Sequence, residues 1–170
     1  LESCCYLVWS EQELRAVVID PGGDPEDIVA KLEENDLAPA WIVNTHGHGD
    51  HIGGNAELKK RWPDAKVAVH EADAPMLTSA LKNLSIAFGM GVKSPGADVI
   101  LHEGDTVETD ALRLEVRHTP GHTRGGITLV LRTQPMHVFC GDTLFAGAIG
   151  RTDFQGGSAE RYPYILGTRR

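Results

Sequence analysis

The stretch Thr45-His46-Gly47-His48-Gly49-Asp50-His51 brings three imidazole groups and one carboxylate group together in a short segment. Core packing does not explain such a density of polar side chains. Imidazole and carboxylate groups are ligands that suit Zn²⁺ and Fe²⁺. The glycines between them let a loop bend so that neighbouring side chains converge on one point. The stretch therefore predicts a metal site.

The residues before this stretch predict a strand that leads directly into the histidines. Ala40 to Thr45 begins as a continuous apolar run of strand length. Further upstream, Tyr6–Trp9 and Arg15–Asp20 predict two short strands rich in β-branched and aromatic residues. The segment from Pro25 to Leu37 predicts an amphipathic surface helix with Asp24 as its N-cap.

The residues after the stretch predict alternating elements and then a strand-rich second half. We expect helices over Asn55–Arg61 and Glu71–Leu84, a strand over Lys66–His70 and a loop over Phe88–Ala97. Further strands are expected over Val99–His102, Ala111–His118, Ile127–Arg132 and Met136–Cys140. No internal repeat or linker divides the chain, so we expect one α/β domain with a layered sheet core.

Two more candidate ligands lie in the second half of the chain. His122 stands in Thr119-Pro120-Gly121-His122-Thr123, and Asp142 stands in Cys140-Gly141-Asp142-Thr143. Each follows a predicted strand and a glycine, and alone each would more often be a turn residue. Together with the histidine cluster they extend the predicted metal site.

These motifs resemble those of the metallo-β-lactamase-fold superfamily, whose signature Thr-His-x-His-x-Asp-His stands here as Thr45 to His51. Ile19-Asp20-Pro21-Gly22, Thr119 to Thr123 and Gly141 to Phe145 are further family landmarks in the expected order. The chain looks closest to the glyoxalase II-like hydrolases. The resemblance implies the α+β class, as an αββα four-layer sandwich with metal sites at the edge of the two sheets. It implies a single such domain over residues 1–170.

The resemblance also implies two divalent metal ions, zinc above all, with iron or manganese as alternatives. The first site would take His46, His48 and His122, the second would take Asp50 and His51, and Asp142 would bridge both metals. Asp50 would also orient the attacking water, which a metal pair activates while it polarises the scissile carbonyl. The implied enzyme is a metallo-hydrolase that acts on a small-molecule thioester or ester, and it needs no protein nucleophile.

The chain also departs from the family pattern. Family members usually carry one more histidine near the C-terminus, and no histidine follows His137 here. The resemblance therefore suggests that a last strand and helix are missing, as well as an opening strand before Cys4. The helical domain by which typical glyoxalase II enzymes hold glutathione is absent as well. The identity of a thioester substrate accordingly does not follow from the motifs.

Other members of the superfamily fit less well. Exported β-lactamases place a cysteine in the second site, where this chain offers Asp142, and nucleases carry a large insertion after the bridging aspartate. Gly150 to Gln155 resembles a segment shared by small bacterial hydrolases and by persulfide dioxygenases, and the dioxygenases bind one iron through the equivalents of His46, His122 and Asp142. A degenerate metal-binding protein without turnover is a further alternative. The stretch from Leu144 to Gly150 favours the small hydrolases.

Charge and composition narrow the class of partner. The 170 residues hold 16 Lys and Arg against 24 Asp and Glu, a net charge of −8, which argues against nonspecific binding to nucleic acid or anionic membranes. No apolar run is long enough for a membrane span, and no signal peptide is visible. Three cysteines, two of them adjacent, make a disulfide framework improbable and favour a reducing cytoplasm.

Several polar residues receive no assigned role from the sequence. Arg124 could meet an anionic substrate, and Arg151 and Asp153 could pair with each other or orient a ligand loop, but surface positions explain them as well. Tyr162 could pack or line a pocket. The remaining histidines lie within or beside predicted strands and have no ligand-like neighbours; they are His70, His102, His118 and His137. The loop Phe88–Ala97 is the expected specificity element, and the sequence does not indicate the oligomeric state.

Overall fold

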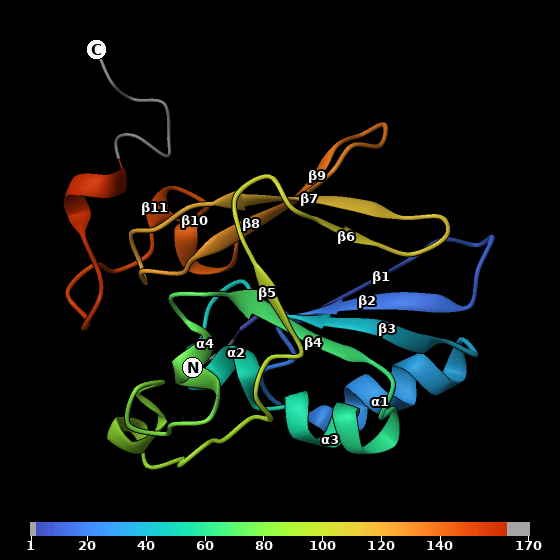
Figure 1. Ribbon diagram of the computed structural model, residues 1–170, viewed down its shortest axis with the longest axis horizontal. Helices are drawn as coiled ribbons and strands as arrows, with labels where there is room; N and C mark the ends of the chain where they lie inside the picture. Colours follow the sequence, from blue (N-terminus) through green and yellow to red (C-terminus); the bar gives the residue numbers. More distant parts are fainter. Residues whose placement is uncertain (1–2, 163–170) are drawn as a thin grey trace.

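A computed structural model of the chain describes residues 3–162 (Figure 1). Its first sheet has five strands in the order β1 (Tyr6–Trp9), β2 (Arg15–Ile19), β3 (Ala38–Val43), β4 (Lys66–His70) and β5 (Val99–Leu101). Strand β1 pairs antiparallel with β2, and the other neighbours pair in parallel. The carboxyl ends of β2 to β5 therefore meet at one edge of this sheet.

The second sheet has four strands, all antiparallel: β6 (Thr106–Glu108), β7 (Arg113–His118), β8 (Ile127–Leu131) and β9 (His137–Phe139). It faces the first sheet (Figure 1). A small hairpin of β10 (Leu144–Phe145) and β11 (Ala148–Ile149) follows it. Short 3₁₀ turns occur at η1 (Ser85–Phe88), η2 (Gly141–Thr143) and η3 (Ala159–Arg161).

The two longest helices, α1 (Pro25–Glu34) and α3 (Asn55–Arg61), lie on the outer face of the first sheet (Figure 1). The one-turn helices α2 (Gly49–Ile52) and α4 (Ala74–Leu77) lie near the carboxyl ends of β3 and β4, which directly precede them in the chain. The expected α+β sandwich of two facing sheets is thus confirmed. Residues 3–162 show three of its layers, namely the helices, the first sheet and the second sheet.

The first sheet is buried on both faces, and strand β2 shows how the sequence achieves this. Val18 packs with Leu32 in the cluster beneath the helices, while Val17 and Ile19 pack with Leu114 in the cluster between the two sheets. Successive side chains of a strand point to opposite faces, so a strand between two layers needs apolar residues at every position. The run from Ala16 to Ile19 meets that need, and all four residues are fully buried.

The predicted helix over Glu71–Leu84 is wrong beyond its first turn. Only α4 forms, and Leu81, which lies in the predicted helix, is 73% exposed. Leu84 adopts a left-handed backbone conformation (φ 64°), which ends any helix because a side chain crowds the backbone there. The side-chain amide of Asn83 donates to the carbonyl oxygens of Met76 and Val92, so the chain folds into a compact series of turns instead.

The other strands and helices match the expectations to within a few residues. Strand β3 runs from Ala38 to Val43, so Thr45 lies beyond it, and β7 begins at Arg113. The short elements α2, β6 and the β10–β11 hairpin were not predicted. They are too short for hydrophobic periodicity to reveal.

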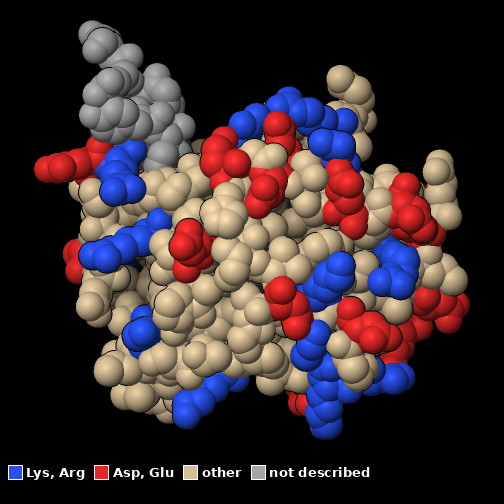
Figure 2. Space-filling model, viewed as in Figure 1, with Lys and Arg blue, Asp and Glu red and all other residues tan. Residues whose placement is uncertain are grey.

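Charged side chains intermingle on the surface. Figure 2 shows Lys and Arg next to Asp and Glu, without a large area of one sign on the face that it presents. None of the described helices is long and apolar enough to cross a membrane.

Candidate metal centre

The candidate ligands come from loops that follow strands of both sheets. His46, His48 and His51 lie in the segment after β3, His122 follows β7, and Asp142 lies in η2 after β9. The two sheets pack face to face, so the ends of these strands are brought together at one edge of the sandwich. Residues almost 100 positions apart in the chain thereby share one site.

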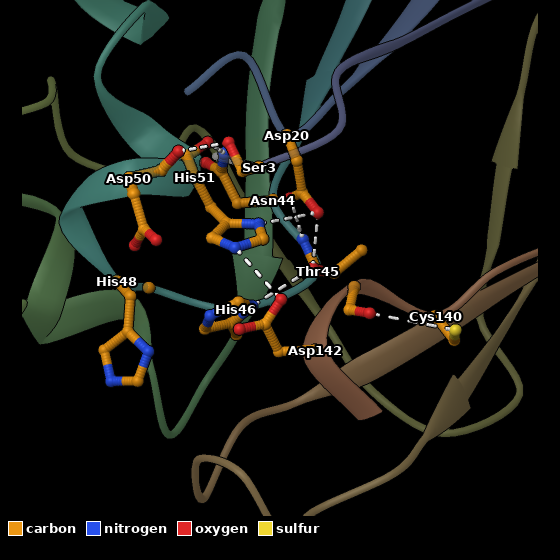
Figure 3. A network of polar contacts seen from close by, with 12 residues as sticks. Ser3, Asp20, Asn44, Thr45, His46, His48, Asp50, His51, Cys140 and Asp142 are labelled. Atoms are coloured by element: carbon orange, nitrogen blue, oxygen red, sulfur yellow. Dashed lines mark hydrogen bonds and ion pairs between the residues drawn. The ribbon is translucent and has the colours of Figure 1, made fainter. Parts of the chain in front are cut away.

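The side chains form two overlapping groups with ligand atoms within 4.8 Å of one another. The first group is His46, His48 and His122, and the second is His46, His51 and Asp142. The Nδ1 atom of His48 lies 2.9 Å from Nε2 of His122, and Nε2 of His51 lies 3.3 Å from Oδ1 of Asp142. Figure 3 shows His46 and His51, from the segment after β3, converging with Asp142 of η2. His46 belongs to both groups, so the two candidate positions adjoin.

Asp50 belongs to neither group. It lies on α2, and Figure 3 shows its carboxylate on the side of the helix nearer to His48. The residue lines one pocket together with His48, His122 and Asp142. The structure therefore places all six predicted residues at one site, with Asp50 on the wall of the pocket.

The hydrogen-bonding partners of His46 determine which of its ring nitrogens is free. The hydroxyl of Thr45 donates to Oδ2 of Asp20 at 2.6 Å, so its oxygen is left to accept from Nδ1–H of His46 at 3.2 Å. The proton then resides on Nδ1, and Nε2 keeps its lone pair. Asp20 itself is held by the backbone N–H of Thr45 at 2.7 Å.

His122 is oriented in the same way. Nδ1–H of His122 donates to the backbone carbonyl oxygen of Arg151 at 2.8 Å, and a carbonyl oxygen can only accept. His122 is therefore held with Nε2 facing the centre, as metal-binding histidines are. Nδ1 of His51 lies at ion-pair distance from Asp20, 3.1 Å from Oδ2, and has no hydrogen-bond partner among the described residues.

The donor set fits a divalent cation. The Nε2 atoms of His46 and His48 are buried and have no hydrogen-bond partner among the described residues. A buried nitrogen without a partner costs about 1–3 kcal/mol, and such a group needs a reason to persist. Three imidazoles around one point, beside a carboxylate, are a donor set that zinc, iron and manganese accept.

The ionisation states of the metal-free centre follow from burial and charge. Burial lowers the pKa of His46 well below its usual value, and the neighbouring His51 and His48 lower it further. Burial and the nearby His122 lower the pKa of His48 to about 3. Burial would also lower the pKa of His51, but Asp20 and Asp142 outweigh it and raise that pKa to about 10. His46 and His48 are thus neutral, which is the form that binds metal.

A buried carboxylate joins the two ligand-bearing loops. Asp73, which is 1% exposed, follows β4. Its carboxylate accepts the backbone N–H of Gly47 at 3.1 Å, the hydroxyl of Thr123 at 2.7 Å and the backbone N–H of Gly125 at 2.8 Å. Gly47 lies between His46 and His48, and Thr123 follows His122. Asp73 therefore fixes the distance between two of the loops that carry the first group.

Gly47 and Gly49 are required for close packing rather than for an unusual backbone conformation. Neither has a positive φ. A Cβ at Gly47 would lie 2.6 Å from Cβ of Met76, and one at Gly49 would lie 2.7 Å from Cβ of Ser85. The ligand loop thus fits tightly against the turns that follow β4, and the flexibility expected from these glycines is not their role here.

The polar residues to which the sequence assigns no role make contacts within the fold. Arg151 forms a two-pronged ion pair with Asp153 at 2.8 Å, and its guanidinium lies 3.9 Å from the ring centroid of Phe154. Tyr162 is buried against Gly121, where an added Cβ would lie 2.7 Å from its ring. The carbonyl oxygen of Arg124 accepts from His118.

The roles of Asp20 and Asp73 were not predicted from the sequence. Asp20 was noted only as a family landmark, and Asp73 was not singled out. Both follow a strand of the first sheet, as the histidine stretch does. An aspartate just after a buried strand is the signal that could have indicated them, because parallel strands end at the same edge.

Comparison with known proteins identifies the family of the chain. The family model of the metallo-beta-lactamase superfamily matches residues 2–167. The hydroxyacylglutathione hydrolase GloC of Haemophilus influenzae is 35% identical over 162 residues, which make up 92% of this chain and 73% of that protein.

Solved structures give the same result. The BLEG-1 B3 metallo-beta-lactamase aligns with a TM-score of 0.89 at 29% identity, over 98% of this chain and 79% of that one. TTHA1623 in a di-iron-bound form aligns with a TM-score of 0.84 at 32% identity, over 99% of this chain and 81% of that one. The family predicted from the motifs is confirmed: the chain belongs to the metallo-beta-lactamase superfamily.

Proposed function

We propose that the chain is a metal-dependent hydrolase that cleaves a small-molecule thioester or ester, as glyoxalase II-like enzymes do. The observation that carries the proposal is the pair of adjoining ligand groups that share His46, with a pocket opening directly onto them. The similarity to a hydroxyacylglutathione hydrolase supports a thioester substrate.

Two divalent cations are proposed, with zinc as the first candidate and iron or manganese as alternatives. His46, His48 and His122 would hold one, and Asp50 and His51 the other, with Asp142 between them. A structural relative in a di-iron-bound form supports a two-metal centre without deciding the metal. Bound there, such cations would supply an activated water at neutral pH and polarise the substrate carbonyl.

The chain's own residues would orient the reaction. Asp50 lines the pocket and is the proposed group that accepts a hydrogen bond from the attacking water. The Asp20–Thr45 pair keeps the Nε2 lone pair of His46 directed at the centre, and the carbonyl of Arg151 does the same for His122. No side-chain nucleophile is required.

One observation supports a second candidate, a persulfide dioxygenase with a single iron. Nε2 of His122 lies 3.5 Å from Oδ2 of Asp142, and His46 adjoins both residues. Two histidines and one carboxylate with open positions form a common non-haem iron site. A metal-binding protein without turnover is the third candidate.

Turnover by protein of verified metal content tests the proposal. We expect hydrolysis of acyl thioesters that depends on the metal and stops on chelation. Oxygen consumption with a persulfide substrate, and no hydrolysis, would favour the dioxygenase. The absence of both activities in fully metal-loaded protein would overturn both enzymatic candidates.

The three cysteines are unpaired, which supports a reducing compartment as the setting.

A further inference from the structure

The pocket beside the metal centre has one wall that contributes no candidate ligand. Its lining includes four candidate ligands, His48, Asp50, His122 and Asp142. The rest of the lining, which we call the apolar wall, is made largely of the apolar side chains of Leu84, Phe88, Met90 and Phe154. Whatever reacts at the centre must therefore lie against these groups.

The polar residues on this wall already use their polar atoms elsewhere. The amide of Asn83 donates to two backbone carbonyls, and its oxygen accepts the backbone N–H of Ser85 at 3.0 Å. The hydroxyl oxygen of Ser85 accepts the backbone N–H of Val92 at 2.8 Å. A substrate would thus meet their carbon atoms, and the wall behaves as an apolar surface.

The charge at the pocket rim is also neutralised. Arg151 is the only lysine or arginine among the described residues that line this pocket, and both prongs of its guanidinium contact Asp153. Its flat face lies over Phe154. The Asp153 carboxylate therefore offsets the positive charge that Arg151 brings to the pocket.

Forming the apolar wall costs free energy. Leu84 has a left-handed backbone, which costs roughly 1–2 kcal/mol for a residue with a side chain. Phe88 and Met90 are 48% and 49% exposed, so they leave apolar surface in water next to the centre. Strain and exposed apolar groups at a pocket are typical of a binding surface.

We propose that this wall binds an apolar, uncharged acyl group attached to the scissile carbonyl, an inference that rests on the proposed hydrolase function. The pocket has a volume of about 120 Å³. An engineered apolar cavity of about 150 Å³ binds benzene. Because candidate ligands line the same pocket, the scissile carbonyl shares this volume, and the acyl group that fits is a short aliphatic chain or at most a single ring.

A series of thioesters with one common thiol and different acyl groups tests the proposal. From acetyl to butyryl, kcat/KM should rise by up to about fourfold for each added methylene, the gain for full burial. Phenylacetyl should be a good substrate and succinyl, which carries a charge, a poor one. Equal kcat/KM values across the series, or a preference for succinyl, would overturn the proposal.

The residues are tested by Phe88→Ala and Met90→Ala, with Ile86→Ala as the matched control. All three side chains are about half exposed and lie on or next to η1, but Ile86 does not line the pocket. Removal of Phe88 or Met90 should flatten the dependence of kcat/KM on acyl length, whereas Ile86→Ala should keep the dependence of the parent chain. An equal effect of Ile86→Ala would contradict the assignment.

Binding of the product acids separates this inference from the proposed function. NMR titration of the metal-loaded protein with acetate, butyrate and phenylacetate needs no turnover. We expect tighter binding of butyrate and phenylacetate, with shifts of the Phe88 and Phe154 ring signals, and loss of the preference in Phe88→Ala. Turnover without this preference would overturn the acyl subsite alone, whereas the preference without turnover would overturn only the hydrolase.

Discussion

At the scale of single residues, the centre depends on groups that can only accept a hydrogen bond. Asp20 and the carbonyl oxygen of Arg151 fix the protons of His46 and His122 on Nδ1. The ligand atoms are thereby oriented before any metal binds. Substitutions of such groups should affect metal binding more than folding.

Asp142→Ala removes the carboxylate that lies 3.3 Å from Nε2 of His51 and 3.5 Å from Nε2 of His122. We expect metal-dependent turnover to fall by at least about 100-fold, because even partners outside the ligand set are worth about 10–100-fold. The side chain is 28% exposed, so the thermal midpoint should change little. Activity assays and calorimetry measure the two effects. Full activity with metal still bound would contradict the assigned role.

Asp20→Asn replaces one accepting oxygen by an amide. The hydroxyl of Thr45 can then donate to Nδ1 of His46, which would move the ring proton to Nε2 and remove the ligand lone pair. We expect metal affinity to fall by about 10–100-fold, measured by competition with a chromophoric chelator. Asp98→Asn, which changes a carboxylate bonded to Lys59 away from the centre, is the control. Unchanged affinity in Asp20→Asn would show that the tautomer is set by other means.

The candidate ligands could be predicted from the sequence because ligand chemistry is local. His46 to His51 are dense in the chain, and His122 and Asp142 stand in short motifs. How the candidate ligands divide between the two groups could not be predicted from local motifs. Asp50 was expected among the ligands of the second site, yet it joins neither group, because its place depends on how α2 packs.

At the scale of elements, the centre depends on loops being held at fixed distances. Asp73 joins the loop after β3 to the loop after β7 through three hydrogen bonds. These loops belong to different sheets, so the contact also connects the two layers. No periodicity in the sequence marks such a contact, which explains why it was missed.

Asp73→Asn tests this connection. The amide keeps only one accepting oxygen, so we expect faster hydrogen exchange at the backbone amide of Gly47 or of Gly125 and about a tenfold loss of metal affinity. Mass spectrometry and chelator competition measure these effects. Asp98→Asn is again the control, since Asp98 also accepts a backbone N–H, that of Val67. Unaltered exchange at both glycines would contradict the connecting role.

The ends of β4 and β7 meet through a stacked pair of histidines, His70 and His118, whose ring centroids lie 4.1 Å apart. Burial and the neighbouring His118 lower the pKa of His70 below its usual 6.5, although Asp73 and Glu71 act in the opposite direction. The unfolded chain therefore binds a proton at His70 more readily than the folded chain does. The contribution of neutral His70 to the free energy of unfolding is fully present above pH 6.5 and is lost as the pH falls below 6.5.

His70→Gln removes this titration and keeps an acceptor for the backbone N–H of Ala72. The decrease in thermal midpoint between pH 7 and pH 5 should be smaller in the variant than in the parent chain. Calorimetry at both pH values measures it. An equal or larger decrease in the variant would contradict the lowered pKa.

At the scale of the whole molecule, the sequence predicted most strands and the two large helices. The run from Ala16 to Ile19 is apolar throughout because β2 is covered on both faces. The order of strands within each sheet depends on contacts between distant segments and was not predicted, and the sandwich of two sheets was expected only from the family resemblance. The failure over Glu71–Leu84 has the same origin, because contacts of Asn83 override a helical pattern.

Bound metal should stabilise the molecule. At a free concentration about 100 times its dissociation constant, a cation that binds only the folded state adds about 2.7 kcal/mol, which for a chain of this size raises the thermal midpoint by roughly 5–10 °C. Addition of a chelator should reverse the shift. No shift with zinc, iron or manganese would contradict a centre preformed in the folded state.

The metal content of the purified chain tests the central claim most directly. The protein is prepared without chelators or a metal-affinity column, and ions are counted per chain by mass spectrometry. We expect about two ions per chain, either zinc or a mixture of zinc with iron and manganese. One iron per chain with little zinc would favour the dioxygenase, and far less than one ion per chain would contradict a metal centre in this fold.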